Sequence, residues 1–291
     1  MRLVQFRDQE GRRAVAVSHA GGHRRLEEIE TVYELVLAAL ESGASLAKTA
    51  AGFQSAQVID VEAALREGRL LPPIEHPVPT RCWVTGSEGA RSPSGGGESP
   101  PSWFFRGSGS TLVAAEKPLA MPGFAPGGAP EAQVAGLFVI ADDGVPCQVG
   151  WCLAHPVVDQ ALARSGGAGH ARLRATAIGP ELLLGELPAA LPAKAAVVRA
   201  GKVLAETWLD LGRAGMARSH ADLIRDHFRY GMHRRPGDVH IHCFGSGSGH
   251  AAAAPGNDPE QLFELTCAAF GLPLRNPVVT LDAPAPEVRL L

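Results

Sequence analysis

Several features that would direct a protein to a polymer or a bilayer are absent from this sequence. Only 20% of the 291 residues are charged and the formal net charge is −3, so neither sign dominates. A balanced charge gives no bulk attraction to nucleic acid or to an anionic membrane surface. The opening residues MRLVQFRDQEG lack the apolar core of a signal peptide, and no run approaches the roughly 18 apolar residues of a membrane span. We expect a cytoplasmic protein without nucleic-acid or membrane partners.

Paired cysteines and the common nucleophile motifs are missing as well. Five cysteines are scattered along the chain and no CxxC pair occurs. An odd, scattered set of this kind is typical of reduced cysteines in the core of a cytosolic protein. The sequence contains no GxSxG, no HExxH and no Cys/His protease signature, so nothing indicates acyl-enzyme chemistry.

The chain does have length, apolar content and turn-forming residues. With 45% hydrophobic residues over 291 positions, it can bury a sizeable core as one large or two unequal domains. Its 34 glycines and 23 prolines favour a loop-rich, β-containing protein over a helical bundle.

Residues 1–73 predict a small α+β domain. RLVQF and RAVAVS are strand-like runs separated by a polar, Gly-containing turn, which indicates a hairpin. The segment after Thr31 carries apolar residues at helical spacing and ends at Gly43, so we expect a helix there and a shorter one near 45–52. We place the end of this domain at Pro72 and Pro73.

Residues 74–291 predict a larger domain in which strands dominate. Short strand-like pieces recur at close intervals, and the few helices are expected at 156–164, 216–231 and 259–271. Such a pattern is typical of a β-roll or sandwich, so the fold class expected for the whole chain is α+β. Residues 86–102 are rich in Gly, Ser and Pro and predict a flexible loop or lid, with a plain linker as the alternative.

Seven segments follow one another along the chain: MRLVQFRDQEGRRAVAV, TVYELVLAAL, WFFRGSGSTLVA, AGLFVIADDGVPCQVGWCLA, LRATAIGPELLLGELP, RRPGDVHIHCFGSGSG and GLPLRNP. In this order they resemble the fumarylacetoacetate hydrolase superfamily, near its branch of 2-keto-3-deoxy-pentonate dehydratase-like proteins. The resemblance implies a C-terminal β-roll domain, a pocket for a small 2-oxo or 1,3-dicarbonyl acid, a divalent metal and a homodimer.

The positions at which the resemblance places metal ligands hold other residues in this chain. The first Glu of the AGLFVI strand falls at Gln133, a second at Ala135, and the acidic residue after the next strand at Pro156. Mg²⁺ prefers carboxylate oxygens, so the carboxylate site is largely dismantled. We expect no cofactor, with Mg²⁺ as the less favoured alternative. The lid, which often carries a His and a Glu for proton transfer in the family, has no His in this chain.

Residues beside these positions are candidates for catalysis and anion binding. His155 could act as a general base, oriented by Asp159 four residues later if Pro156 begins a helix. A polar residue at a helix N-terminus with no catalytic role is the alternative. The resemblance places a substrate-side Lys at Arg172. Arg172 and Arg106 can each hold a carboxylate through two hydrogen bonds, or can be ordinary ion-pair residues.

The segment VHIHCFGSGSG predicts part of the pocket wall. His240 and His242 alternate with β-branched residues, so both point to one side of a strand. We expect a structural or pocket-wall role for them, and a metal-binding role is less favoured. Backbone N–H groups from Gly245 onward, together with Ser246, would line the substrate carboxylate, with a nucleotide phosphate as the alternative ligand.

The residues leave three possibilities open. We favour an enzyme that acts on a small 2-oxo or 1,3-dicarbonyl acid through an enol or enolate, and lyase, dehydratase, hydrolase, tautomerase or cyclase chemistry is compatible with this. Glu131 and Gln133, two apart on one strand face, would bind the substrate. A non-catalytic protein that binds a metabolite or partner in the old pocket is the alternative. The third possibility keeps a metal at Glu131, His155 and Asp159.

Overall fold

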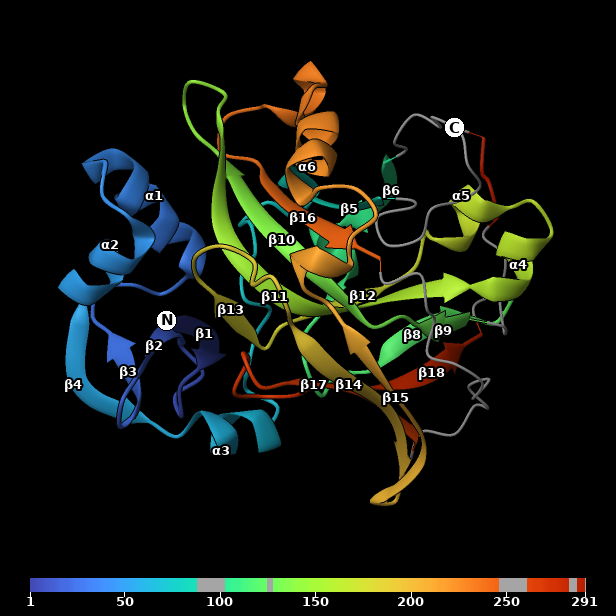
Figure 1. Cartoon of the computed structure of the whole chain (residues 1–291), viewed down its shortest axis with the longest axis horizontal. Coiled ribbons are helices and arrows are strands. Elements are labelled where there is room, and N and C mark those ends of the chain that lie inside the picture. Colours follow the sequence, from blue (N-terminus) through green and yellow to red (C-terminus); the bar gives the residue numbers. More distant parts are fainter. Residues whose placement is uncertain (88–102, 125–127, 246–260, 283–286, 291) are drawn as a thin grey trace.

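The structure is a computed structural model that describes residues 1–87, 103–124, 128–245, 261–282 and 287–290. It contains two β-sheets, one large and mixed, the other of five strands (Figure 1). Figure 1 shows α1 and α2 beside the N-terminal strands on the left and the five-stranded sheet at the lower right. The α+β fold class predicted from the sequence is confirmed.

The helices are short and the strands numerous. The helices are α1 (Val32–Ser42), α2 (Leu46–Gly52), α3 (Val61–Arg66), α4 (Gln160–Arg164), α5 (Ala168–Ala171) and α6 (His220–Phe228), with single 3₁₀ turns η1 (Pro79–Arg81), η2 (Gly109–Thr111), η3 (Arg213–Gly215) and η4 (Gly231–His233). Along its main path the large sheet runs β4 (Gln54–Ile59), β3 (Gly22–Leu26), β2 (Arg13–His19), β1 (Arg2–Arg7), β13 (Glu181–Leu183), β11 (Pro146–Asp159), β10 (Gln133–Ile140), β16 (Val239–Phe244), β5 (Cys82–Ser87) and β6 (Trp103–Ser108). Three short strands attach to it, β12 (Thr176–Ile178), β7 (Leu112–Val113) and β9 (Gly128–Pro130). The second sheet runs β15 (Lys202–Asp210), β14 (Pro192–Arg199), β17 (Gln261–Cys267), β18 (Leu274–Leu281) and β8 (Leu119–Pro122).

The N-terminal elements form as their sequence predicts. Thr31 caps α1 through a bond from the Glu34 backbone N–H, and the Glu34 side chain accepts in return from the Thr31 N–H. Gly43 ends the helix in the left-handed conformation, with φ of 64°. Strands β1 and β2 form the expected hairpin. Because β1 also pairs with β13, the N-terminal strands continue the large sheet, and a domain boundary at residue 73 stays a prediction.

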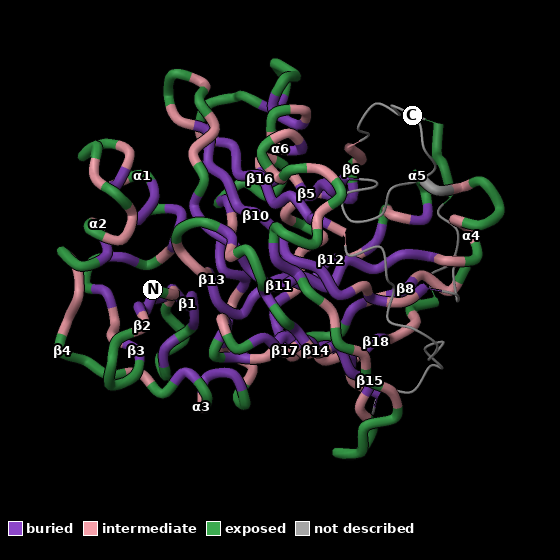
Figure 2. The backbone as a smooth tube through the Cα atoms, viewed as in Figure 1, coloured by how far each residue is buried: buried purple, intermediate pink, exposed green. Residues whose placement is uncertain are grey.

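The central strands bury side chains on both faces. Along β10 and β11, Val134 and Leu153 belong to a core that extends into the five-stranded sheet, whereas Ala135 and Cys152 belong to a core that extends to α1. This alternation follows from the two-residue period of a strand. β10 is buried along its whole length and β11 is buried after its first three residues, and Figure 2 shows exposure at the hairpin tips and helix surfaces.

Two of the predicted helices are strands in part or in full. Residues 156–159 continue β11, and α4 begins only at Gln160 with Asp159 as its N-cap. Residues 261–267 form β17, because Phe263 and Leu265 pack inward at strand spacing and β14 pairs with the whole segment. The predicted helix 216–231 is confirmed as the shorter α6.

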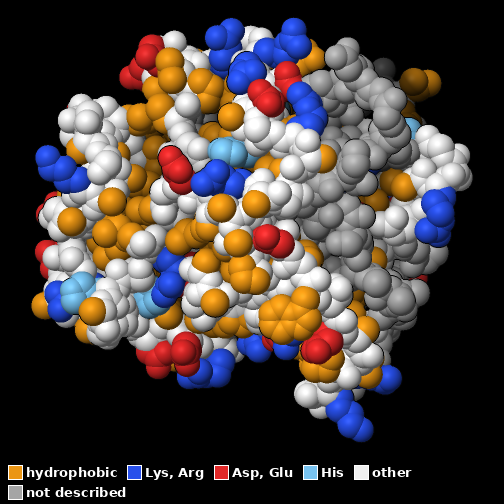
Figure 3. Space-filling view, in the orientation of Figure 1, with side chains coloured by type: hydrophobic (Ala, Val, Ile, Leu, Met, Phe, Trp, Pro, Cys, Tyr) orange, Lys and Arg blue, Asp and Glu red, His pale blue; other side chains and the backbone are white. Residues whose placement is uncertain are grey.

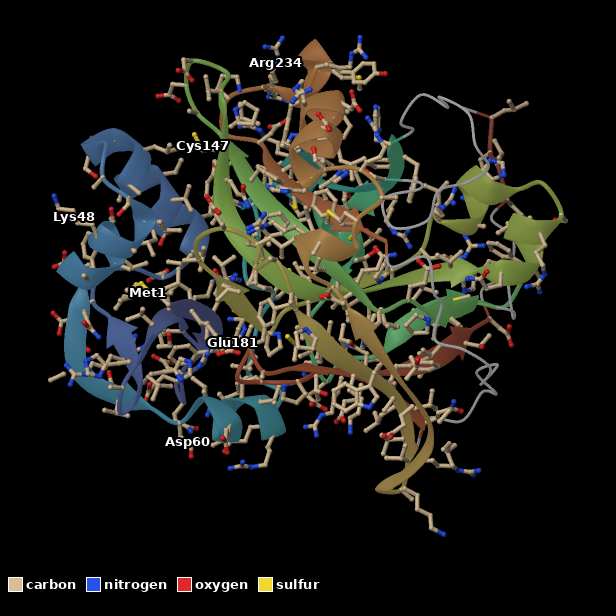
Figure 4. The ribbon with its side chains drawn as sticks, in the orientation of Figure 1. Met1, Lys48, Asp60, Cys147, Glu181 and Arg234 are labelled. Carbon is tan, nitrogen blue, oxygen red and sulfur yellow. The ribbon has the colours of Figure 1, made fainter. Side chains whose placement is uncertain are left out.

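Glu181, labelled in Figure 4, connects the N-terminal strand β1 with the segment that precedes β18. This fully buried carboxylate accepts hydrogen bonds from Arg2 Nε at 2.8 Å and from the backbone N–H of Leu272 at 2.9 Å. A charge buried in this way is stable because both oxygens have donors. The N-terminal strand is thereby tied to the segment that leads into β18.

Candidate active site

A buried guanidinium lies at the centre of the candidate site. Arg106, on β6, is 1% exposed. Its Nη2 donates to the carbonyl oxygen of Val157 at 2.8 Å, while its Nε has no hydrogen-bond partner. Among the described residues it forms no ion pair. Burial lowers the pKa of Arg106, since low dielectric disfavours the charged form.

A second arginine shares an aromatic neighbour with Arg106. The Cζ atom of Arg172, at the end of α5, lies 4.2 Å from the ring centroid of Phe104, and that of Arg106 lies 5.6 Å from it. Both distances allow a cation–π contact. The two arginines, far apart along the chain, therefore lie near one aromatic ring, and their role in anion binding stays a prediction.

A carboxylate and an amide complete this cluster. Gln133 Nε2 donates to Glu131 Oε2 at 2.7 Å, so the two side chains meet as their spacing predicts. The backbone N–H of Glu131 bonds the carbonyl of Pro156, which holds the pair against β11. A Cβ placed on Gly245 would lie 3.4 Å from Gln133 Nε2, so the start of the Gly/Ser segment borders the pair.

Cys243 is a member of the cluster that the sequence did not indicate as functional. Its thiol is buried, and burial raises its pKa to about 11 even though the positive Arg106 opposes the shift. A thiol of this kind is neutral near pH 7. Its i, i+2 spacing from Ile241 on β16 placed it on this face, but apolar packing was the simpler interpretation. Arg106, Phe104, Glu131, Gln133 and Cys243 are called the anion face below.

The donor set does not match the needs of Mg²⁺. Gln133 offers one amide oxygen, and Ala135 and Pro156 offer no side-chain oxygen at all. Glu131 is a single carboxylate close to a buried cation, whereas Mg²⁺ takes several oxygen ligands in octahedral geometry. Within the described ranges no group of three or more His, Cys, Asp or Glu side chains is arranged to hold a metal ion.

His155 points away from the anion face. It is fully buried, and its Nδ1 lies 3.3 Å from Asn276 Oδ1 on β18. Asn276 in turn donates to the carbonyls of Ala114 and Lys117. His155 therefore faces the five-stranded sheet, and a general-base role at the anion face does not fit this position.

Asp159 does not orient His155. Because β11 continues to residue 159, the two residues are separated by strand rather than helical spacing. Asp159 caps α4 through the Leu162 N–H and pairs with Arg174 Nη2 at 3.5 Å. The predicted catalytic pair is therefore wrong. The structure also does not gather Glu131, His155 and Asp159 into the alternative metal site.

His242 lies on the opposite side of β16 from Cys243. Its two ring nitrogens lie 2.8 Å from Thr85 Oγ1 and 2.6 Å from Ser87 Oγ. His242 therefore lies away from the anion face, and its predicted pocket-wall role stays a prediction. Ser246 and nearly all of the predicted lid, from 88 to 102, lie outside the described residues.

Comparison with known proteins supports the fold. No protein-family model and no curated protein matches the chain. Among solved structures, 2-keto-3-deoxy-D-arabinonate dehydratase complexed with magnesium and 2,5-dioxopentanoate matches with a TM-score of 0.71 and 19% identity, covering 97% of this chain and 100% of that one. A 5-carboxymethyl-2-hydroxymuconate delta-isomerase from Mycobacterium smegmatis matches with a TM-score of 0.65 and 17% identity, covering 97% and 100%. A 2-hydroxyhepta-2,4-diene-1,7-dioate isomerase from Mycobacterium marinum matches with a TM-score of 0.64 and 18% identity, covering 96% and 98%. The resemblance stated from the sequence is thereby confirmed at the level of the fold.

Proposed function

We propose that this chain is a divergent enzyme of the fumarylacetoacetate hydrolase superfamily that acts on a small 2-oxo or 1,3-dicarbonyl acid through an enol or enolate. The observation that carries the proposal is Arg106, a fully buried guanidinium with an unpartnered Nε and no counter-ion among the described residues. A lone buried charge is costly unless a partner arrives. A planar carboxylate suits the two-pronged donor geometry of arginine.

The solved structures with this fold suggest the kind of acid. One holds 2,5-dioxopentanoate, which is a 2-oxo acid, and two others are isomerases by name. In our proposal Arg106 anchors the carboxylate of a similar acid and Arg172 lies near its carbonyl. Positive charge at that oxygen stabilises the negative charge that develops there.

Glu131 is the proposed proton acceptor. It takes a proton from the carbon next to the ketone, the C–H electron pair forms the carbon–carbon double bond of the enolate, and the ketone oxygen gains the charge. The Gln133 amide donates to Glu131 Oε2 at 2.7 Å and fixes that oxygen, while Gln160 Nε2 lies 3.5 Å from Oε1, a long contact that the acidic C–H of the substrate would replace. Gln133 thus has a role as an amide at the position where the family resemblance implies a carboxylate.

A metal is not required in this arrangement. The dehydratase of the same fold was solved with magnesium. In this chain the guanidinium groups of Arg106 and Arg172 would supply positive charge directly. We therefore propose that arginine and backbone N–H donors stabilise the enolate in place of Mg²⁺.

The test combines binding, turnover and metal analysis. The probes are pyruvate, 2-oxoglutarate and 2,5-dioxopentanoate, measured by calorimetry and by deuterium incorporation next to the ketone. We expect binding that EDTA does not abolish, and about 100-fold weaker binding in Arg106→Met, because a charge-assisted pair is lost. Arg275→Met, which removes a half-buried ion pair with Glu116 outside the anion face, is the control.

Three results would contradict the proposal. Activity lost with EDTA and restored by Mg²⁺ would return the chain to metal-dependent chemistry. Tight binding of an acid without any exchange or turnover would favour the alternative, a non-catalytic protein that binds a metabolite in the old pocket. Equal binding by wild type and Arg106→Met would remove the basis of both.

A homodimer is part of the proposal, and β15 offers a surface for it. This strand ends the five-stranded sheet, and Val203, Leu204 and Trp208 on it are 52%, 54% and 71% exposed. Figure 3 shows the hairpin at the lower edge of the view, with basic side chains at its tip. If two copies of β15 pair antiparallel about Glu206, Lys202 faces the partner's Asp210 and Leu204 faces the partner's Trp208.

Sedimentation tests the dimer. Leu204→Lys on β15 should give monomers, whereas Val58→Lys, an exposed valine on the opposite edge strand β4, should not. A wild-type monomer at micromolar concentration would contradict the surface. All five cysteines are free thiols, in keeping with the proposed reducing cytoplasmic location. None of the helices in the described part of the chain has the length and apolar character to cross a bilayer.

A further inference from the structure

Four histidines gather on the side of β16 opposite the anion face. His240 and His242 project from β16, His227 from α6 and His233 from η4, and each is at most 1% exposed. The ring centroid of His227 lies 4.3 Å from the ring centroid of His233, 5.1 Å from that of His240 and 4.7 Å from that of His242. We call these four residues the histidine face.

Hydrogen bonding leaves three of the imidazole nitrogens unsatisfied. His227 Nε2 lies 3.1 Å from His240 Nδ1, so one of the two carries the shared proton. His233 Nδ1 donates to the His227 carbonyl at 2.7 Å. The other nitrogens of His227, His233 and His240 are buried without a partner. With neutral rings, whichever tautomer holds, two buried lone pairs lack a donor and one buried N–H lacks an acceptor.

Among the described residues, the side chains that contact these rings most closely are aromatic and carry no charge to balance a protonated ring. Trp83 stacks on His240, with an angle of 9° between the planes, and Trp103 lies edge-on against His233 at 4.4 Å. Phe228 and Phe138 close the side toward α6 and β10, and Tyr230 lies 5.7 Å from His233.

The carboxylates on the neighbouring elements are occupied. Asp238, at the start of β16, binds Arg81 and the Trp83 indole N–H. On α6, Asp226 pairs with Arg218 and Asp222 with Arg225. The exposed Arg229, Arg234 and Arg235 near η4 add further positive charge. Burial lowers the pKa of all four histidines, and repulsion from neighbouring rings lowers it further for His227, His240 and His242.

From this geometry we propose that α6 and η4 form an acid-released cover, which packs on β16 only while the histidine face is uncharged. In the described part of the chain one added proton meets only carboxylates that are already paired with arginines, and a second proton places like charges about 5 Å apart, where repulsion is strong in a buried site. Separating α6 and η4 from β16 lets water reach the charged rings. The cover then opens with uptake of more than one proton.

The cover is connected to the anion face through β16 itself. Residues alternate along this strand, so His242 and Cys243 are neighbours that face opposite sides. Gly245, just after the strand, borders Gln133. Loss of packing on one face therefore loosens the strand that supports the other.

Hydrogen exchange with mass spectrometry tests the cover without any assay of activity. Exchange of residues 219–233 is followed from pH 7.5 to 5.0 after correction for the intrinsic rate, with α1 as the internal reference. We expect the opening equilibrium to rise below pH 6.5 by about ten-fold per pH unit for each proton taken up, and α1 to stay protected. His233→Gln and His240→Gln should each reduce this slope by about one proton. His170→Gln, an exposed histidine on α5, should not.

Three outcomes would overturn the proposal. The first is protection of α6 that is unchanged down to pH 5.0, and the second is loss of protection in α1 and α6 together. The third is Zn²⁺ at pH 7.5 protecting α6 in wild type but not in His233→Gln, which would make the unpartnered nitrogens a cation site. If one Gln variant fails to fold, the wild-type profile and the remaining variant still decide between these outcomes.

Discussion

The two faces of β16 bury ionisable groups in opposite ways. On the anion face Arg106 keeps its charge, lacks a counter-ion among the described residues and retains an unpartnered Nε. On the histidine face four imidazoles give up their charge, and two nitrogens of His242 are satisfied by Thr85 and Ser87. One sheet therefore carries a buried guanidinium, the proposed anion site, on one side and a cluster of buried neutral imidazoles on the other.

This difference follows from the chemistry of the side chains. A guanidinium stays protonated at any pH at which the protein folds, so burial leaves it in need of an anion. An imidazole has a normal pKa near neutrality and can respond to burial by losing its proton. Burial alone thus indicates a ligand on the anion face and sensitivity to acid on the histidine face.

The largest effect is expected from Glu131 on the anion face. Glu131→Gln should lower the rate of proton exchange next to the ketone by about 10² to 10⁴, the usual contribution of a general base, with little change in binding. Single-turnover deuterium exchange with 2-oxoglutarate measures it. Glu116→Gln, whose carboxylate pairs with Arg275, serves as control. Equal rates for Glu131→Gln and wild type would assign the base elsewhere.

Acid should destabilise the protein through the histidine face. The pKa of His240 and of His242 is lowered to about 3 in the folded state, below the unfolded value near 6.5. This stabilisation is complete above pH 6.5 and is lost as the pH falls toward 3, about 2 kcal/mol for each ring at pH 5. Urea unfolding at pH 7.5, 6.0 and 5.0 should show a fall of about 4 kcal/mol unless the cover opens first. A flat profile would contradict the buried neutral cluster.

A substitution at Asn276 should affect the stability of the protein but not its binding of 2-oxo acids. Asn276→Ala removes one donor from each of the buried carbonyls of Ala114 and Lys117 and one contact of the His155 ring, so the free energy of unfolding should fall by about 2 to 3 kcal/mol. Binding of 2-oxo acids at pH 7.5 should change less than about two-fold, since these groups face away from Arg106. Urea unfolding and calorimetry, with exposed Gln57→Ala as control, measure both quantities. Weakened binding would place His155 in the site after all.

The smallest change in stability is expected at Arg106 itself. Arg106→Met removes an uncompensated buried charge and keeps apolar volume, so the free energy of unfolding should stay within about 1 kcal/mol of wild type or rise. Arg81→Met leaves buried Asp238 without its partner and should cost about 2 kcal/mol. Urea unfolding of the two variants gives the comparison. A larger loss in Arg106→Met would mean that its bond to Val157 has a structural role.

Local patterns predicted the N-terminal elements well and the site only in part. The capping box at Thr31 and the turn between β1 and β2 are written in adjacent residues, so both could be found in the sequence. The pairing of Glu131 with Gln133 likewise depends on strand spacing alone. The His155–Asp159 pair failed because its spacing was interpreted as helical, whereas pairing with β12 and β9 keeps this segment in β11.

The histidine face shows what sequence patterns miss. His227 and His240 lie 13 residues apart in different elements. Only the packing of α6 against β16 brings their ring nitrogens to a hydrogen-bond distance of 3.1 Å. Phe263 and Leu265 alternate at strand spacing in a segment whose other residues favour a helix. Hydrogen bonding to β14 makes this segment a strand. Propensity is a weak signal when a neighbouring strand offers hydrogen bonds.

The sequence by itself determined the β1–β2 hairpin, the caps of α1 and the absence of carboxylates at Gln133, Ala135 and Pro156, because these depend on the identity and spacing of neighbouring residues. The tertiary structure decided which side of each strand faces which partner. Side chains on a strand alternate between two faces. Only the packing of both faces shows that Arg106 and Glu131 lie near each other, whereas His155 and His242 lie on the opposite side.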